Sequence, residues 1–403
     1  MRKVLFVLLT LTLLSGCTQA TLPPNMSLLS ELAEQGAGVG LYQQFGFDLY
    51  HQLNSGSLEN LLISPTSIAL AVSMTLNGAD GGTRQQMLEA LGLGDCDLQQ
   101  LNEANQLLIR RLQDSDVTLS IANSLWMRQG IEFNQDFVQS NQTYYDAAAH
   151  NLDFSSDAAV ETINNWVKEQ TNDLIDGIIE GPIHPLTLMF LINAIYFQGD
   201  WGMPFDPDRT KEGLFHTPQG TVNVPFMRQT DKFDYLYQDG LQALRLPYAD
   251  EELAMYLFLP EDWEAFQQQL TAEQWQGWLG DFRSERVQLE LPKFEFAYEE
   301  QLNDALQALG MTLPFAAGQA DFHLIADIEQ DIYISEVKHK SFIAVDEVGT
   351  EAAAVTSVEM VATGMPVEPI QLKFDRPFFF VIHDRMTDTA LFMGQVMDPA
   401  RTE

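Results

Sequence analysis

The side chains best suited to covalent chemistry in this chain are serine and histidine, the pair that a hydrolase would use as nucleophile and base. Ser64 and His339 are the candidates for those roles. The sequence lacks a GxSxG nucleophile elbow, a phosphate-binding loop and the kinase motifs. It also lacks CxxC, HExxH or clustered His and Cys at metal-ligand spacing. We therefore expect no catalytic residue, no metal and no cofactor, and a hydrolase is the weakest of the functions considered.

A second segment has the chemistry of a substrate rather than of an enzyme. Residues 347–356 read EVGTEAAAVT, and no proline follows before Pro366. From Thr350 onward every second residue is small or uncharged: Thr350, Ala352, Ala354, Thr356, Val358, Met360 and Ala362. The other parity carries Glu351 and Glu359, so a strand formed here would have one buried and one wet face. Its Gly and Ala content gives little strand propensity, and an Ala-rich helix or a surface loop remains open on local sequence.

Motifs elsewhere decide between these alternatives. They are NLLISPTSI at 60–68, IANSLW at 121–126, INNWVKEQTNDLI at 163–175, LINAIYFQG at 191–199, LPKF at 291–294, VKHKSF at 337–342, LKFDRPFFFVI at 372–382 and LFMG at 391–394. Together with EVGTEAAAVT, this set resembles the serpin family over residues 39–399. The resemblance implies an α+β fold with three β-sheets, about nine helices and an exposed reactive-centre loop at about residues 347–372. It also implies one serpin domain over residues 39–403.

Several positions match serpin sites residue by residue. Ser64, Ser67, Asn193 and His339 match a polar cluster beneath the large sheet, the shutter. Trp201, Lys293 and Glu347 match the breach, where the loop enters that sheet. Glu347, Gly349, Thr350, Glu351, Ala352, Ala353 and Ala354 match the hinge. The resemblance implies an ion pair between Lys293 and Glu347 that keeps the hinge just outside the sheet, and it makes Ser64 and His339 part of a latch.

The implied activity is inhibition of a serine protease as a suicide substrate. The protease forms an acyl bond to the loop, which then inserts as a strand into the large sheet. None of the residues that would be buried is charged or proline, so insertion is permitted. A non-inhibitory serpin-fold binding protein, or a plain protease substrate, is the alternative.

The reactive bond is expected between Thr363 and Gly364, with Met360 and Ala362 as alternative scissile residues. Residues 348–371 contain no Lys or Arg, so trypsin-like proteases find no side chain for their acidic pocket. Elastase-like and subtilisin-like enzymes fit best, chymotrypsin-like enzymes less well, and papain-like cysteine proteases remain an alternative.

The N-terminus predicts export. Arg2 and Lys3 precede an apolar run at residues 4–14, which is too short to span a bilayer. The following LLSGC resembles a bacterial lipobox, which implies a signal peptide at residues 1–16 and acylation of Cys17. Residues 17–38 then form a lipidated, flexible tether. We expect an outer-membrane lipoprotein, or a cell-surface or extracellular protein; the alternative is an ordinary leader with an incidental cysteine.

Charge limits the partners. The chain has 57 acidic and 21 basic residues and a net charge of −36, which argues against nucleic acid and heparin-like polyanions. The expected helix at 98–113 offers only Arg110 and Arg111, interpreted as solvated charges. With Cys17 acylated, Cys96 is left as an unpaired thiol in a loop or helix end. The expected partners are a target protease and a membrane bound through the lipid anchor, with the protein itself a monomer.

Hydrophobic patterns predict the elements that position these residues. Strands are expected at 117–127, 187–197, 254–259, 287–296, 370–383 and 389–397, and a strand-like run at 331–345. A helix is expected at 156–179, with Ser156 or Asp157 as its N-cap.

Overall fold

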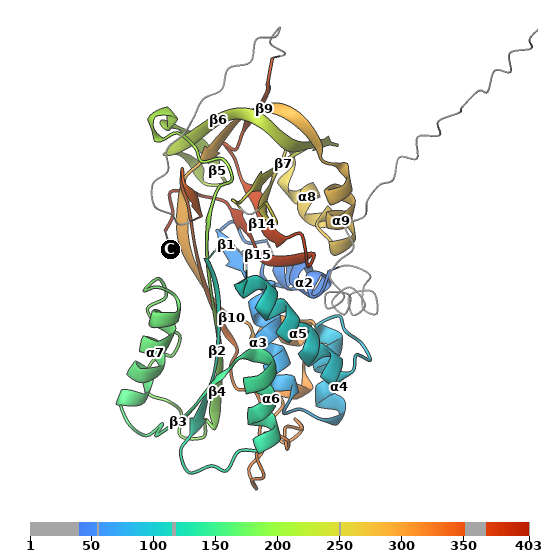
Figure 1. The fold of residues 1–403 in the computed structure, drawn as a ribbon, viewed down its shortest axis with the longest axis vertical. Helices are drawn as coiled ribbons and strands as arrows, with labels where there is room; N and C mark the ends of the chain where they lie inside the picture. Colours follow the sequence, from blue (N-terminus) through green and yellow to red (C-terminus); the bar gives the residue numbers. More distant parts are fainter. Residues whose placement is uncertain (1–39, 55, 115–117, 250, 351–367, 403) are drawn as a thin grey trace, which may run out of the picture.

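The chain folds around two hydrogen-bonded sheets with helices on their faces (Figure 1). The computed structural model describes residues 40–54, 56–114, 118–249, 251–350 and 368–402. Its six-stranded sheet has the order β10–β11–β12–β4–β2–β3. The strands are β2 (Thr118–Arg128), β3 (Ala148–Leu152), β4 (Met189–Asp200), β10 (Phe294–Gln301), β11 (Lys338–Val345) and β12 (Gly349–Thr350). All neighbours are antiparallel except β2 and β3.

The second sheet has nine strands in the order β1–β15–β14–β8–β7–β6–β9–β13, with β5 paired to β6. They are β1 (Leu61–Ile63), β5 (Lys211–Thr217), β6 (Gly220–Gln238), β7 (Leu241–Pro247), β8 (Leu253–Pro260), β9 (Arg283–Pro292), β13 (Ile370–Lys373), β14 (Phe378–Asp384) and β15 (Thr389–Val396). The long strand β6 pairs first with β5, then with β9 and at its end with β7. It thereby joins two smaller sheets, and with the six-stranded sheet these make the three sheets expected.

Nine α-helices lie in the described part of the chain. They are α2 (Gln43–Leu53), α3 (Pro65–Leu76), α4 (Gly81–Ala90), α5 (Leu98–Gln113), α6 (Gln135–Tyr145), α7 (Ala158–Gln170), α8 (Trp263–Gln269), α9 (Ala272–Asp281) and α10 (Asn303–Ala308). Two 3-10 turns, η1 (Pro207–Arg209) and η2 (Leu313–Phe315), connect strands and helices. Figure 1 shows α7 on one face of the six-stranded sheet and α3, α5 and α6 on the other. No helix among these residues is long and apolar enough to cross a membrane.

Helix α3 is the element that matters most for the site. Ser64 caps it, since its hydroxyl accepts a hydrogen bond from the Ser67 amide at 3.2 Å, and Pro65 occupies the first turn where no amide donor is needed. All its residues except Ala71 are buried, so the helix packs on every side. It therefore lies inside the molecule, with its N-terminus beneath the six-stranded sheet.

The structure corrects several predicted boundaries. The helix expected at 156–179 ends at Gln170, because Asn172 and Asp173 take positive φ angles of 49° and 65°. Asp157 is its N-cap residue, without a side-chain capping bond. The strand-like run at 331–345 is a strand only from Lys338, in β11.

Two predicted strands are each divided in two. The strand expected at 287–296 breaks at Lys293, whose amide donates to the Pro225 carbonyl, because β9 belongs to one sheet and β10 to the other. The strand expected at 370–383 breaks between β13 and β14 at Pro377, which has no amide to donate.

Candidate functional site

The central feature of the site is the two-residue strand β12 (Gly349–Thr350). Thr350 pairs with Val345 of β11 on one side and with Gly199 of β4 on the other, and Gly349 pairs with Asp200. Among the described strands, β4 and β11 are joined through β12 and share no ladder of their own. The first hinge residues are therefore already part of the sheet.

This arrangement corrects the expectation of a hinge held just outside the sheet. Gly349 and Thr350 are buried, and buried backbone groups need partners: Gly349 pairs with β4, and Thr350 pairs with both β4 and β11. The other end of the expected loop is also a strand, since β13 pairs in parallel with β9 from Ile370 to Lys373.

Gly349 fits this position only because it has no side chain. A Cβ built on it would lie 2.1 Å from the Gly199 carbonyl oxygen and 2.8 Å from the Asp200 Cα. Gly199 is equally constrained, because a Cβ there would lie 2.8 Å from the Tyr248 ring. Gly349 thus lets β12 approach β4 at strand spacing, while Gly199, the register partner of Thr350, leaves room for the Tyr248 ring.

Thr350 is held by an aromatic cluster. Its hydroxyl lies 2.8 Å from the Tyr248 hydroxyl, and both groups are buried. The Tyr248 ring stacks on Trp201 with ring centroids 4.9 Å apart. The Trp201 indole N–H donates to the Asp346 carbonyl at 2.9 Å, and its amide donates to the Val348 carbonyl at 2.8 Å. Trp201 therefore contacts the residues that lead into β12.

Glu347 is fixed by two side chains. Its carboxylate accepts hydrogen bonds from Lys293 Nζ and from the Thr210 hydroxyl, each at 2.7 Å. Burial, the largest influence, raises the pKa of this carboxyl, but the bonds from Lys293 and Thr210 together with the charge of Lys293 outweigh it, and the net pKa is lowered. Glu347 is thus held as a carboxylate.

A tight turn connects β11 to β12. The Asp346 side chain accepts from the amides of Val348 and Gly349, at 2.9 and 3.2 Å, and its own amide donates to the Gly349 carbonyl. An aspartate that bonds to the backbone two residues on is a common turn-forming device. The sequence did not predict three of these site residues: Asp346, Thr210 and Tyr248. Of the three, only Asp346 had a sequence signal, because an aspartate two residues before Val348-Gly349 is typical of a turn.

The shutter residues lie where the N-terminus of α3 meets two strands. His339 of β11 accepts from the Ser64 amide at 3.2 Å through Nε2. On β4, Asn193 accepts a short hydrogen bond from the Ser67 hydroxyl and donates to Asn123 Oδ1 at 2.7 Å. The four residues thus form two pairs, Ser64 with His339 of β11 and Ser67 with Asn193 of β4. In the described structure, the two pairs are joined only through the first turn of α3.

His339 is neutral in this environment. It is 5% exposed, and burial lowers its pKa to about 4. A neutral imidazole can accept from the Ser64 amide, whereas an imidazolium has no lone pair to do so. The Ser64 hydroxyl accepts from the Ser67 amide, with no bond to His339 of the kind that a nucleophile and base would share.

Comparison with known proteins identifies the fold and the family. The model of the family described as serpin (serine protease inhibitor) matches residues 41–399. A serpin-like protein of Thermococcus kodakarensis is 35% identical, with 99% of each chain covered. The chain belongs to the serpin family. Serpins are protease inhibitors rather than catalytic enzymes, so inhibition is the activity associated with this family.

Solved structures agree with this assignment. Tengpin, a thermophilic serpin in its native state, is similar with a TM-score of 0.81 at 35% identity, over 89% of this serpin and 93% of tengpin. Human thyroxine-binding globulin in complex with thyroxine gives a TM-score of 0.83 at 27% identity, over 93% and 100% of the two chains. The predicted serpin fold is confirmed.

Part of the predicted site lies outside the described residues. These positions are Cys17, Glu351, Ala352, Ala353, Ala354, Met360, Ala362, Thr363 and Gly364. Within the described residues, Lys293 binds Glu347, Trp201 bonds to the residues on either side of Glu347, and Gly349 and Thr350 lie in the sheet. The reactive bond and the lipidation site stay predictions from the sequence of this serpin.

Arg111 differs from its interpretation as a solvated charge. Its guanidinium forms a short ion pair with Glu252 and lies 3.7 Å from Asp384, whose side chain is 1% exposed. The carboxylate of Asp384 is buried, and a buried charge requires a partner of opposite sign. Arg111 supplies that charge and is a structural residue, while Arg110 is exposed at the end of α5.

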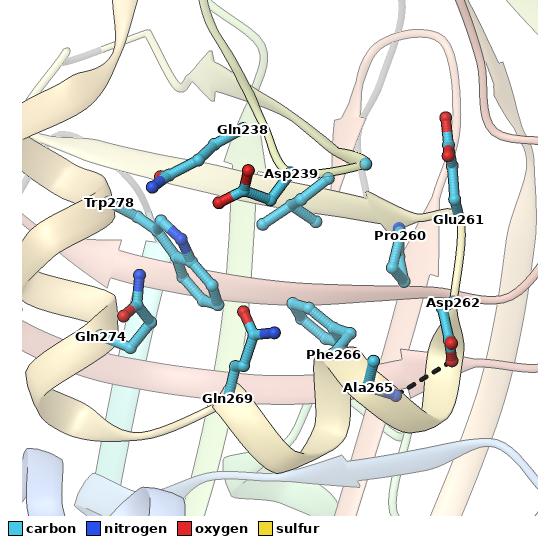
Figure 2. Close-up of a pocket in the computed structure, with 12 residues that line it drawn as sticks. Gln238, Asp239, Pro260, Glu261, Asp262, Ala265, Phe266, Gln269, Gln274 and Trp278 are labelled. Atoms are coloured by element: carbon cyan, nitrogen blue, oxygen red, sulfur yellow. Dashed lines mark hydrogen bonds between the residues drawn. The ribbon is translucent and has the colours of Figure 1, made fainter.

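Other features of this serpin do not contribute to the site. Figure 2 shows a cavity of about 170 Å³ lined by residues of α8, α9, the β6–β7 turn and the end of β8. Phe266 and Trp278 form its buried floor, and none of its lining residues belongs to the hinge, breach or shutter. Within the described ranges, no group of three or more His, Cys, Asp or Glu side chains could hold a metal ion. Cys96 is a free thiol.

Proposed function

We propose that this serpin inhibits serine proteases as a suicide substrate. The hydroxyl of the protease's catalytic serine attacks the carbonyl of the scissile residue, Thr363 or a close neighbour, and the peptide nitrogen leaves with a proton. The part of the loop N-terminal to the cut then inserts between β4 and β11, while its end remains esterified to the protease. Elastase-like and subtilisin-like enzymes are the targets that the loop sequence favours.

The observation that carries this proposal is the position of β12. Gly349 and Thr350 occupy the place between β4 and β11 that an inserted strand would extend, and the Thr350 side chain is buried against Tyr248. Counting on from Thr350 by twos, the next residues on its face are Ala352, Ala354 and Thr356. They are small and uncharged, so continuing the strand would bury no charge beneath the sheet.

Insertion of the loop would release enough free energy to distort a docked enzyme. About fourteen residues at roughly 3.3 Å each span on the order of 45 Å, which is the distance an attached protease would be carried. Each new ladder hydrogen bond contributes about 0.5–1.5 kcal/mol net, so the strand as a whole contributes on the order of ten kcal/mol.

Denaturing gels test the proposal directly. The protein is incubated with elastase, subtilisin and trypsin, boiled and separated. We expect a covalent complex with elastase or subtilisin and none with trypsin. Clean cleavage without a complex and without a gain in thermal stability would favour the alternative, a serpin-fold binding protein or plain substrate. Turnover of a small ester or peptide would favour a hydrolase instead.

Two arginine substitutions test the insertion step. Thr350→Arg places a charge on the buried face and should convert the inhibitor into a substrate. Glu351→Arg changes the predicted wet face, so it serves as the matched control and should keep the covalent complex. Inhibition that survives Thr350→Arg unchanged would rule out insertion.

We further propose that the inhibitor acts as a monomer at the cell envelope of a bacterium, exported and anchored through acylated Cys17. The leader, the LLSGC segment and the tether at residues 17–38 support this location. A tethered inhibitor would protect its own cell from foreign or stray proteases.

A further inference from the structure

Two positive charges face each other on the outer surface of the nine-stranded sheet. Lys232 of β6 and Arg286 of β9 are direct register partners in an antiparallel pair. Both side chains are exposed, and neither has an ion-pair partner within the described part of the chain. Like charges directly opposite each other in a sheet are destabilising, with Cβ atoms about 4.5–5.5 Å apart.

The neighbouring charges on the same face are already neutralised. Four residues along the strands toward Lys293, Arg228 forms an ion pair with its register partner Glu290 at 3.2 Å. In the other direction, Asp234 accepts from Arg245 of β7 at 3.0 Å. Thr230 and its register partner Gln288, which lie between the Arg228–Glu290 ion pair and the Lys232–Arg286 pair, carry no charge. Lys232 and Arg286 are therefore an unneutralised pair in a row of matched side chains.

Nearby carboxylates do not change this conclusion. Asp231 and Glu285 adjoin the pair in sequence but have the opposite strand parity, and the Asp231 carboxylate accepts from the Lys232 backbone amide at 2.7 Å. The chain has 57 acidic residues, so a repelling pair of cations without a carboxylate between them is unexpected on composition.

The pair lies beside the end of the loop. Strand β13 pairs with β9 so that Ile370 is opposite Val287, the residue next to Arg286. Gln371 also bonds to Gln288 at 3.3 Å on the face that Arg286 shares. At about 4.8 Å between strands, Arg286 is one strand and Lys232 two strands from the segment where the chain returns from the loop. Figure 1 shows β6 and β9 together at one end of the molecule.

We propose that Lys232 and Arg286 form a docking site for surface carboxylates of the target protease. A protease that has bound the loop must cover the sheet from which the loop returns, and Asp or Glu side chains on its rim would then neutralise the two cations. This assignment rests on the proposed inhibitory function and adds to it a property of the target. At an ionic strength near 0.15 M the Debye length is about 8 Å, so this local pair outweighs the distant negative charges of the serpin at contact distance.

Association rates with subtilisin and elastase test the proposal. The variant Lys232→Glu/Arg286→Glu reverses both charges, and Arg110→Glu, which reverses one exposed charge on α5, is the control for a charge reversal elsewhere on the surface. We expect the double variant to associate about tenfold more slowly in about 50 mM NaCl, with the difference lost in about 500 mM NaCl. The number of serpin molecules used per trapped protease should stay the same, and the control should differ from wild type by less than twofold.

Binding of the same proteases with their catalytic serine replaced by alanine separates this proposal from the inhibitory function. If the wild type traps no active protease, the inhibitory function fails, but weaker binding of the inactive protease by the double variant would still support the docking site. Equal binding and equal rates for wild type and double variant at low salt would overturn the docking proposal.

Binding to anionic vesicles is a second test. Salt-sensitive binding of the wild type to such vesicles, lost in the double variant, would assign the pair to a membrane and also overturn the docking proposal. Melting temperatures at or above that of the wild type would show that the variants fold.

Discussion

Glu347 Oε2 accepts a hydrogen bond from Lys293 Nζ at 2.7 Å, although the two residues are 54 positions apart. Lys293 stands between β9 and β10, where the chain passes from one sheet to the other, and Glu347 precedes β12. The ion pair therefore ties the first residues of the loop to the junction of the two sheets. It does so with Gly349 and Thr350 inside the sheet rather than outside it.

Lys293→Met should lower the free energy of unfolding by about 1 kcal/mol at pH 7, because Glu347 loses its charged partner. The pKa of Glu347 is lowered below its ordinary 4.5 in the folded protein, so its contribution is present above pH 4.5 and is lost as the pH falls through the folded pKa. Urea denaturation should thus show a smaller difference between wild type and variant at pH 3.5 than at pH 7. Lys168→Met, which removes an exposed pair with Asp176, is the control. A difference independent of pH would contradict this account.

Gly349→Ala should force β12 out of the sheet. The new Cβ would lie 2.1 Å from the Gly199 carbonyl oxygen, which is backbone and cannot rotate away. We expect a loss of about 1–3 kcal/mol and faster deuterium exchange at the Thr350 amide. Gly280→Ala in α9 is the matched control, since a Cβ there meets nothing within 4 Å and alanine favours helix. Equal melting temperatures for Gly349→Ala and Gly280→Ala would show that β12 is not packed as described.

His339 should make stability depend on pH. Its folded pKa of about 4 is below the ordinary value of 6.5, so the unfolded chain binds the proton more readily. The stability due to neutral His339 is complete above pH 6.5 and is lost as the pH falls from 6.5 towards 4. On this basis His339→Gln should remove about 3 kcal/mol of the pH dependence between pH 7 and pH 4. The exposed His216→Gln is the control, and identical pH profiles for wild type and His339→Gln would refute the assignment.

Thr363→Arg should give the serpin a new target. The loop of the wild type offers no Lys or Arg between residues 348 and 371, whereas an arginine at the scissile position fits the acidic pocket of trypsin. We expect a boiling-resistant complex with trypsin in the variant only. The mass of the released C-terminal fragment identifies the bond that is cut. Cleavage after Met360 or Ala362 in the wild type would move the scissile bond from its predicted position.

Cys17→Ser should release the protein from the membrane. Without a thiol to acylate, the chain would lose the anchor predicted from LLSGC. Wild type expressed in a bacterium should partition into the detergent phase and incorporate labelled palmitate, and the variant should do neither. Wild type that stays in the aqueous phase would favour an ordinary secretory leader.

Much of the fold could be predicted because its signals are spread along the chain. Residues 98–113 form α5 as expected, and the apolar run at 187–197 lies within β4 apart from its first two residues. The predicted ends of the strands were less accurate than their existence. Whether residues 287–296 make one strand or two depends on which sheet each half joins, and local hydrophobicity at Lys293 does not contain that information.

The candidate site shows the same limit. Lys293, Glu347 and Trp201 could be named from the sequence because they lie in matched motifs. Thr210 and Tyr248 could not, because their contacts with Glu347 and Thr350 arise only when separate strands meet. The insertion of Gly349 was missed for a related reason: low strand propensity predicts a loop, but an unpaired strand edge on each side overrides it.

The two residues of β12 would also be the nucleus from which strand insertion starts. In a chain that zips into a sheet, the slowest step is the first pairing, since chain entropy must be lost before several contacts can form. Here that first contact exists before any bond is cut. After scission the strand would only have to grow. Because an ester to a protease is hydrolysed within a limited time, a preformed nucleus would favour capture over escape.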